Sequence, residues 1–177
     1  MNASWGARLI HGAVLSALLL LALYFPYWWF GVVPFSADYS VSQAQIDELL
    51  KGKNLIDYYA EPLAPISDAE LAIQKEAFTW CRFCHTLKQG GENRVGPNLY
   101  RIFGKPAAVV GGFYYSDAFL EAQAQGLVWT PETMAAFIAD PHTMVPGNRM
   151  RYPPSVGYET NPEKERIMLD YLLRMTR

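Results

Sequence analysis

The N-terminal part of the chain is its longest apolar stretch, with no charged side chain between Arg8 and Asp38. Residues 9–30 would form about 33 Å of helix at ~1.5 Å per residue, enough to cross the hydrocarbon core of a bilayer. The stretch ends in bulky aromatic residues, which are poor signal-peptidase sites and good interfacial anchors. We therefore expect residues 1–31 to be an uncleaved signal anchor rather than a cleaved signal peptide. The positive charge at Arg8 would keep the N-terminus in the cytoplasm.

Residues 32–66 form a connector that is richer in apolar side chains than a flexible linker. Ser42 can cap a short helix that ends at Gly52. Apolar residues lie along this helix and after it: Ile46, Leu49, Leu50, Leu55, Ile56, Tyr58 and Tyr59. This surface has two interpretations. It packs on the domain that follows in the same chain, or it docks on a neighbouring membrane protein.

Residues 67–177 carry the signals of several helices and no alternating strand pattern. Residues 67–70 have the form of a capping box and should begin a helix that runs through Phe78 toward Cys81. The pairs 130–131 and 161–162 each read as an N-cap followed by proline, and the first of these two helices should end before Pro141. The last helix carries an apolar stripe of Ile167, Met168, Tyr171, Leu172 and Met175. We expect an all-α, loop-rich domain.

The strongest chemical signal is Cys81-Arg82-Phe83-Cys84-His85, which is typical of a c-type haem attachment site. Each cysteine can form a thioether to the haem, and the histidine can ligate the iron. A zinc site would need two more ligands, but the chain has no other cysteine, and His11 and His142 are scattered. A thioredoxin-like pair lacks the expected strand and helix pattern. The motif thus predicts one haem c, covalently bound through Cys81 and Cys84.

Composition adds two limits. The chain has 177 residues and a net charge of −2, so no nucleic acid or other polyanion is implied as a partner. Residues 67–177 contain twelve basic and twelve acidic side chains. Several basic residues flank the haem motif and the later methionine loop, where they can form a rim that steers acidic partners: Arg82, Lys88, Arg94, Lys105, Arg149 and Arg151.

An iron that shuttles electrons needs a second axial ligand opposite the histidine. Among the methionines of residues 67–177, Met134, Met168 and Met175 fall on predicted helix faces and are expected in the core. Met144 and Met150 both fall in the loop after the helix that begins near residue 130. Residue type and position leave the choice between these two open.

Several motifs then follow the order and spacing of class I cytochrome c, of the mitochondrial and α-proteobacterial type. The resemblance covers about residues 67–177, and its motifs are Gly96-Pro97-Asn98-Leu99, Phe103-Gly104, 112–118, Trp129 and 146–150. With the N-terminal stretch, the chain resembles membrane-bound bacterial cytochromes c.

The resemblance implies roles for individual residues. Met150 would be the distal ligand, and the backbone carbonyl of Pro97 would accept the proximal imidazole's other N–H. Tyr115 and Trp129 match positions that hydrogen-bond a haem propionate. Lys105 stands where the family usually has an arginine near a propionate, so the charge is kept and bidentate geometry is lost.

Other positions depart from the family. Phe137 replaces a tyrosine that would donate to the methionine sulfur. Ile73 and Ala77 occupy positions that are usually glycine and aromatic in the first helix, and Phe78 is expected to supply the aromatic ring one residue later. Three extra residues between Asp117 and Trp129 should enlarge a loop.

The resemblance implies an electron-transfer protein, not an enzyme, in the bacterial inner membrane with its haem domain in the periplasm. We expect it to carry electrons from a quinol-oxidising complex, a quinol:cytochrome c oxidoreductase, to a terminal oxidase or photosynthetic reaction centre. The alternative is a fixed haem subunit of such a respiratory or photosynthetic complex, docked through the connector. A haem sensor or peroxidase would require Met150 to be absent from the iron.

Overall fold

The computed structural model describes residues 5–30, 40–152 and 162–177, and for residues 26–30 the backbone only. The chain divides into two compact units, residues 1–37 and residues 38–177, which are taken separately below. The second unit therefore contains both the described part of the connector and the domain that bears the haem motif.

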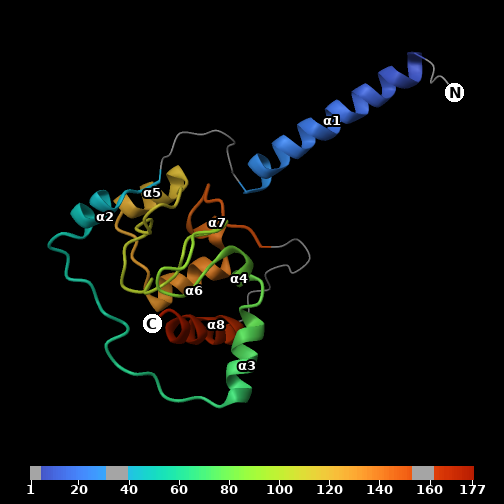
Figure 1. The fold of residues 1–177 in the computed structure, drawn as a ribbon. Coiled ribbons are helices and arrows are strands. Elements are labelled where there is room, and N and C mark those ends of the chain that lie inside the picture. Colours follow the sequence, from blue (N-terminus) through green and yellow to red (C-terminus); the bar gives the residue numbers. More distant parts are fainter. Residues whose placement is uncertain (1–4, 31–39, 153–161) are drawn as a thin grey trace. The chain divides into compact units, whose positions relative to one another are not determined.

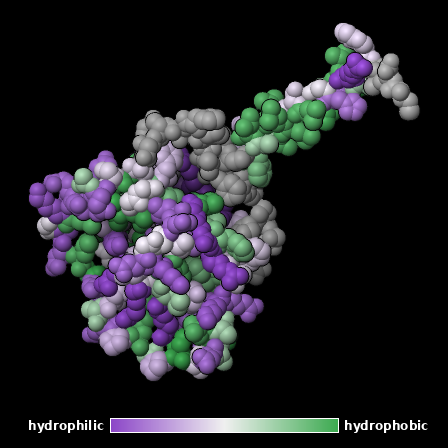
Figure 2. All heavy atoms as spheres, in the orientation of Figure 1, coloured by the Kyte–Doolittle hydropathy of each residue, from purple (hydrophilic) through white to green (hydrophobic). Residues whose placement is uncertain are grey.

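The first unit is a single long helix, α1 (Trp5–Phe30), which begins four residues earlier than the apolar pattern predicts. Within it, Trp5–Phe25 has a mean hydropathy of 1.8, and none of this window is buried against the rest of the chain. Apolar side chains cover most of its surface (Figure 2). The helix is long and apolar enough to cross a bilayer, a criterion that a signal sequence also meets.

The second unit is built from helices and loops, and its described residues contain no strand, only an isolated antiparallel bridge between Pro106 and Val128. This confirms the all-α prediction. Its helices, shown in Figure 1, are α2 (Gln43–Leu50), α3 (Asp68–Ala77), α4 (Cys81–Cys84), α5 (Asp117–Ala124), α6 (Pro131–Ala139), α7 (Pro141–Met144) and α8 (Pro162–Met175).

The predicted caps set the helix starts. Ser42, Ser67 and Thr130 each cap a helix through a full capping box, so that the first backbone N–H groups have partners. Lys51 follows the end of α2, and Gly52 then takes a φ of +70°, as expected for a glycine at a helix C-terminus. The start of α8 at Pro162 also agrees with prediction, while its predicted cap, Asn161, lies outside the described residues.

Helices α3 and α8 cross, and α6 packs on α8 (Figure 1). At the crossing, Phe78 is 3% exposed and its ring centroid lies 5.1 Å from that of Tyr171. Phe78 thus supplies the aromatic contact one residue after Ala77, as predicted, although α3 ends at Ala77. Ile73, at the position where a glycine was expected, is 55% exposed and lines a surface groove together with Ile167 of α8.

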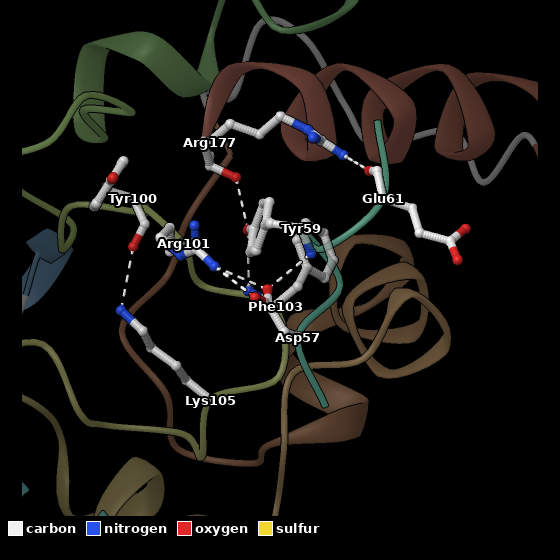
Figure 3. Close-up of polar contacts among 9 residues, drawn as sticks. Asp57, Tyr59, Glu61, Tyr100, Arg101, Phe103, Lys105 and Arg177 are labelled. Atoms are coloured by element: carbon white, nitrogen blue, oxygen red, sulfur yellow. Dashed lines mark hydrogen bonds and ion pairs between the residues drawn. The ribbon is translucent and has the colours of Figure 1, made fainter. Parts of the chain in front are cut away.

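The described part of the connector packs on its own chain (Figure 3). The hydroxyl of Tyr59 accepts a hydrogen bond from Phe103 N at 3.2 Å and lies 2.8 Å from Thr176 Oγ1. Arg101 pairs with Asp57 at 2.8 Å. Of the two interpretations of the connector, packing within the chain is therefore the one observed for residues 40–66.

Earlier in the connector, Gly112 N donates to Val41 O at 3.1 Å, and Ile46 is buried in α2. The peptide backbone thus contributes to this packing as well as the side chains. At the other end, Arg174 and Arg177 donate to the backbone carbonyls of Ala64 and Glu61. The described part of the connector, residues 40–66, is therefore held near residues 41, 59 and 61–64.

Two predictions about methionines need correction. Met175 was expected in the core, but it is 37% exposed, because the buried face of α8 continues from Leu172 to Thr176, one residue further along, rather than to Met175. Met144 was expected in a loop, but it is the last residue of the short helix α7, which Asp140 caps. Met134 and Met168 are buried in the core, as predicted.

Candidate functional site

The two cysteines lie at the ends of the one-turn helix α4, with free thiols. Cys81 O accepts from His85 N at 2.9 Å, which continues the turn, and Cys84 O accepts from Gly96 N at 2.9 Å. Burial raises the pKa of Cys81 to about 11 and raises that of Cys84 as well. Burial therefore favours the protonated form of both thiols, since it disfavours the charged thiolate.

His85 is held in one orientation by the loop that follows it. Its Nδ1 donates to Pro97 O at 2.8 Å, the contact that the resemblance implies. A side chain at Gly96 would overlap the imidazole ring, so only glycine fits beside it. Burial lowers the pKa of His85, while the bond to Pro97 acts in the opposite direction. A neutral ring with its proton on Nδ1 leaves Nε2 to coordinate a metal.

Three aromatic rings form a wall in the same core, with Trp129 and Phe137 buried and Phe119 partly buried. The centroid of Trp129 lies 5.2 Å from that of Phe137, edge to face, and Phe137 lies 5.5 Å from Phe119. Phe137 has no hydroxyl, so the wall is apolar where the family has a tyrosine. Cys81, Leu99 and Met150 pack against this core.

The Met150 loop is fixed by a buried asparagine. Asn148 is 1% exposed, and its amide donates to Pro141 O at 2.6 Å and Val145 O at 2.8 Å. Its Oδ1 accepts from Met150 N at 2.8 Å. Arg149 lies over the Tyr114 ring at 4.7 Å. The backbone of Met150 is thus positioned by a side chain whose own partners lie in α7 and the turn after it.

Of the three residues expected near the propionates, Lys105 and Tyr115 lie on the loop between residues 100 and 116, and Trp129 lies against it. Tyr115 is 7% exposed, its hydroxyl accepts from Val110 N at 3.3 Å, and burial raises its pKa. Lys105 Nζ donates to Tyr100 O at 3.3 Å, and burial, with the charge of Arg101, lowers its pKa. Backbone bonds of Gly104 and Lys105 to Trp129, each 2.8 Å long, bring this loop against the aromatic wall.

This arrangement fits a covalently attached haem. It offers two thiols one helical turn apart, an imidazole with one free nitrogen, a partly buried thioether and an apolar aromatic wall, which together match the attachment, ligation and lining of haem c. Among the described residues, no group of three or more His, Cys, Asp or Glu side chains could hold a metal ion.

Sequence reasoning overlooked three contributors to this site. Asn148 was noted only as part of the methionine loop, although a buried amide is a usual device for fixing a turn. Gly96 was noted only as part of a family motif, and not as the residue that leaves room for the imidazole of His85. Phe119 lies in the enlarged segment after Asp117, where helix α5 was not predicted.

No protein-family model matches the chain. The chain is, however, 36% identical over 95 residues to cytochrome c2 iso-2 of Magnetospirillum molischianum, which covers 54% of this chain and 90% of that protein. It is 33% identical over 106 residues to cytochrome c2 of Agrobacterium tumefaciens, covering 60% of this chain and 92% of that protein. It is also 38% identical over 74 residues to cytochrome c of Stellaria longipes, covering 42% of this chain and 66% of that protein.

Proposed function

Because this chain belongs to the class I cytochrome c family, we propose that it is a membrane-anchored carrier that moves single electrons between membrane redox complexes. It is an electron-transfer protein rather than an enzyme, and it carries one haem c bound through Cys81 and Cys84. When bound, this group supplies a reversible one-electron couple, and the protein tunes and presents it.

We assign His85 and Met150 as the axial ligands. The assignment is supported most by the geometry of His85, whose Nδ1 is engaged by Pro97 O beside the two thiols. Asn148 holds the backbone of Met150, which favours Met150 over Met144, the last residue of α7. Two protein ligands would leave no open position for a substrate, and if both stay bound in the two oxidation states the reorganisation would be small.

Lys105, Tyr115 and Trp129 would hold the propionates. Each lies on or against the loop that packs on the aromatic wall, and Lys105 and Tyr115 each carry a polar group whose pKa burial has shifted toward the neutral form. A propionate beside Lys105 would favour its charged form again. The apolar wall of Phe119, Trp129 and Phe137 excludes water, and with the methionine ligand this favours a raised potential.

We further propose that α1 stays attached as a single-pass anchor in the bacterial inner membrane, with the haem domain in the periplasm. The length and hydropathy of Trp5–Phe25 support this. Confinement to the membrane raises the effective concentration of membrane partners. The donor would be a quinol-oxidising complex, and the acceptor a terminal oxidase or photosynthetic reaction centre.

The alternative is a fixed haem subunit of such a complex. Docking through the connector would have to use the apolar surface that stays exposed there, such as Ile56, because Ile46 and Tyr59 are buried on the chain's own domain. The reduced apolar surface of the connector favours the mobile carrier. Purification from native membranes in mild detergent distinguishes the two: the carrier leaves as a monomer, and a fixed subunit co-purifies at constant stoichiometry.

The function itself is tested in membranes of the source bacterium from which this chain has been deleted. Restoring the full-length protein should restore quinol-driven haem reduction and its reoxidation by oxygen or light, and mass spectrometry should find residues 5–30 retained. Ready carbon monoxide binding by the reduced protein would instead support a haem sensor or peroxidase.

A further inference from the structure

The backbone of Arg101, four residues before Lys105, is strained. Its φ is +48°, in the left-handed region that a non-glycine residue keeps only where its surroundings hold it there. The preceding residue, Tyr100, provides the carbonyl that accepts from Lys105 Nζ at 3.3 Å. Because the φ of Arg101 orients the peptide plane that contains this carbonyl, whatever holds Arg101 also helps to place the amine of Lys105.

The connector supplies much of what holds Arg101 (Figure 3). The guanidinium donates from Nη2 to both carboxylate oxygens of Asp57, at 2.8 and 3.0 Å, and lies 4.9 Å from the centre of the Tyr59 ring. Asp57 also accepts from Tyr59 N at 2.9 Å, so these two connector residues act as one unit. From the C-terminus, Thr176 O accepts from Arg101 N at 2.7 Å.

The connector also fixes the backbone that leads on to Lys105. The hydroxyl of Tyr59 accepts from Phe103 N at 3.2 Å. The next residue, Gly104, passes so close to the carbonyl oxygen of Ile56 that a Cβ there would overlap it. The connector therefore contacts this loop as far as the residue immediately before Lys105.

The charges of these residues act on Lys105 as well. Burial lowers the pKa of Lys105, and the positive charge of Arg101 lowers it further. Asp57, paired with Arg101 at 2.8 Å, partly offsets this repulsion. The connector therefore favours the charged form of Lys105, which is the form that pairs with a carboxylate.

We propose that the connector tunes the haem, with Asp57 and Tyr59 as positioning residues that hold Lys105 beside a haem propionate and thereby raise the reduction potential. This role rests on the proposed function, in which Lys105 holds a propionate, and it belongs to a segment outside the part of the chain that resembles class I cytochrome c. Negative charge near the iron favours the ferric state, and a lysine beside the propionate offsets that charge. Loosening the connector should therefore lower the potential, whereas a connector that only stabilised the fold would leave it unchanged.

The test is an optical redox titration of the full-length holo-protein in detergent, without a redox partner. Tyr59→Phe removes the hydroxyl that accepts from Phe103 N and changes no charge. We expect it to lower the equilibrium constant for haem reduction by a fixed mediator about threefold, which is about 30 mV at ~59 mV per tenfold. The matched control is Tyr58→Phe, which removes the neighbouring hydroxyl from a ring whose centroid lies 6.3 Å from that of Phe103. Tyr58→Phe should keep the wild-type potential.

Lys105→Gln shows whether the effect passes through Lys105. We expect Lys105→Gln to lower the potential, and Tyr59→Phe to lower it no further in the Lys105→Gln background. An unchanged potential in Tyr59→Phe would overturn the proposal, and so would an equal fall with and without Lys105.

The same variants separate a failure of the proposal from a failure of the proposed function. If Lys105→Gln lowers the potential and Tyr59→Phe does not, the propionate role of Lys105 stands and the role of the connector is wrong. If Lys105→Gln itself keeps the wild-type potential, the propionate role assigned under the proposed function is wrong, and the role of the connector fails with it.

Discussion

The connector at 40–66 and the haem-attachment segment at 80–95 are both rich in large apolar side chains, yet they place them differently. In the connector, Ile46 and Tyr59 are 4% and 7% exposed. In the attachment segment, Trp80 and Phe83 remain at the surface. The difference lies in what these side chains contact: Ile46 and Tyr59 pack on other parts of the second unit, whereas Trp80 and Phe83 lie at the surface with their ring centroids 5.7 Å apart.

Tyr59 shows what that complementarity requires. Its hydroxyl bonds to Phe103 N and Thr176 Oγ1, and its ring lies 4.9 Å from the Arg101 guanidinium and 6.0 Å from that of Arg177. A buried tyrosine is stabilising only when its hydroxyl has such partners. The described part of the connector therefore belongs to the folded core, whereas Trp80 and Phe83 of the attachment segment stay exposed.

Removing the central side chain of the connector should have the largest effect on stability. We expect Tyr59→Ala to lower the free energy of unfolding by about 3–4 kcal/mol, because it leaves a cavity and unpaired polar groups. Guanidinium unfolding of the detergent-solubilised holo-protein, followed by haem absorbance, measures this. A change below about 1 kcal/mol would mean that the connector does not pack as described.

Gly104→Ala tests the packing of the connector on the loop that contains Gly104. A Cβ at Gly104, where φ is +84°, would overlap the carbonyl oxygen of Ile56. We therefore expect Gly104→Ala to lower the free energy of unfolding by about 2–3 kcal/mol. Gly126 is the matched control, because its φ is +89° but a Cβ there meets nothing within 4 Å. Gly126→Ala should cost only about 1 kcal/mol. Equal losses in both variants would contradict the contact with Ile56.

Tyr59→Phe keeps the ring and removes the hydrogen bonds of the hydroxyl. We expect it to lower the free energy of unfolding by about 1–2 kcal/mol, because Phe103 N loses its acceptor. Burial raises the pKa of Tyr59 above its usual 10.0. The folded state thus holds the phenol proton more tightly than the unfolded state, so this stabilisation is complete below pH 10 and is lost as the pH rises through the folded pKa. The difference between wild type and variant should shrink in that range, and a constant difference would contradict the assignment.

Phe83→Ser should have the smallest effect on stability, within about 0.5 kcal/mol, because an exposed side chain loses few contacts. The same unfolding measurement checks it beside Tyr59→Ser, which should resemble Tyr59→Ala. If Phe83→Ser destabilised the protein as much as Tyr59→Ser, the two segments would not differ in the way described.

Much of the fold followed from local signals. The caps at Ser42, Ser67 and Thr130 begin helices where the sequence predicted, because a capping box is encoded within four residues. Helices α5 and α7 were not predicted, since each is short and lies beside loop-forming residues. The sequence did not decide whether the connector packs on its own chain or on another protein. That packing depends on contacts between distant residues, such as Tyr59 with Thr176, which lie 117 residues apart.

For the site, the motif at residues 81–85 was sufficient to predict the attachment chemistry, and the resemblance supplied the contact between His85 and Pro97 that the structure contains. The support of the Met150 loop could not be read from spacing. It depends on Asn148 being buried between α7 and the following turn, which requires the packed fold.

The most direct test of the electron-transfer account compares Met150→Ala with Met144→Ala in the full-length holo-protein. Met144→Ala should leave the visible spectrum and the midpoint potential unchanged. Met150→Ala should remove the spectral signature of methionine ligation and lower the potential on the order of 0.2 V, within the ~0.8 V range that axial ligands control. An unchanged spectrum and potential in Met150→Ala would contradict the assigned ligand and, with it, the closed iron site on which the proposed function depends.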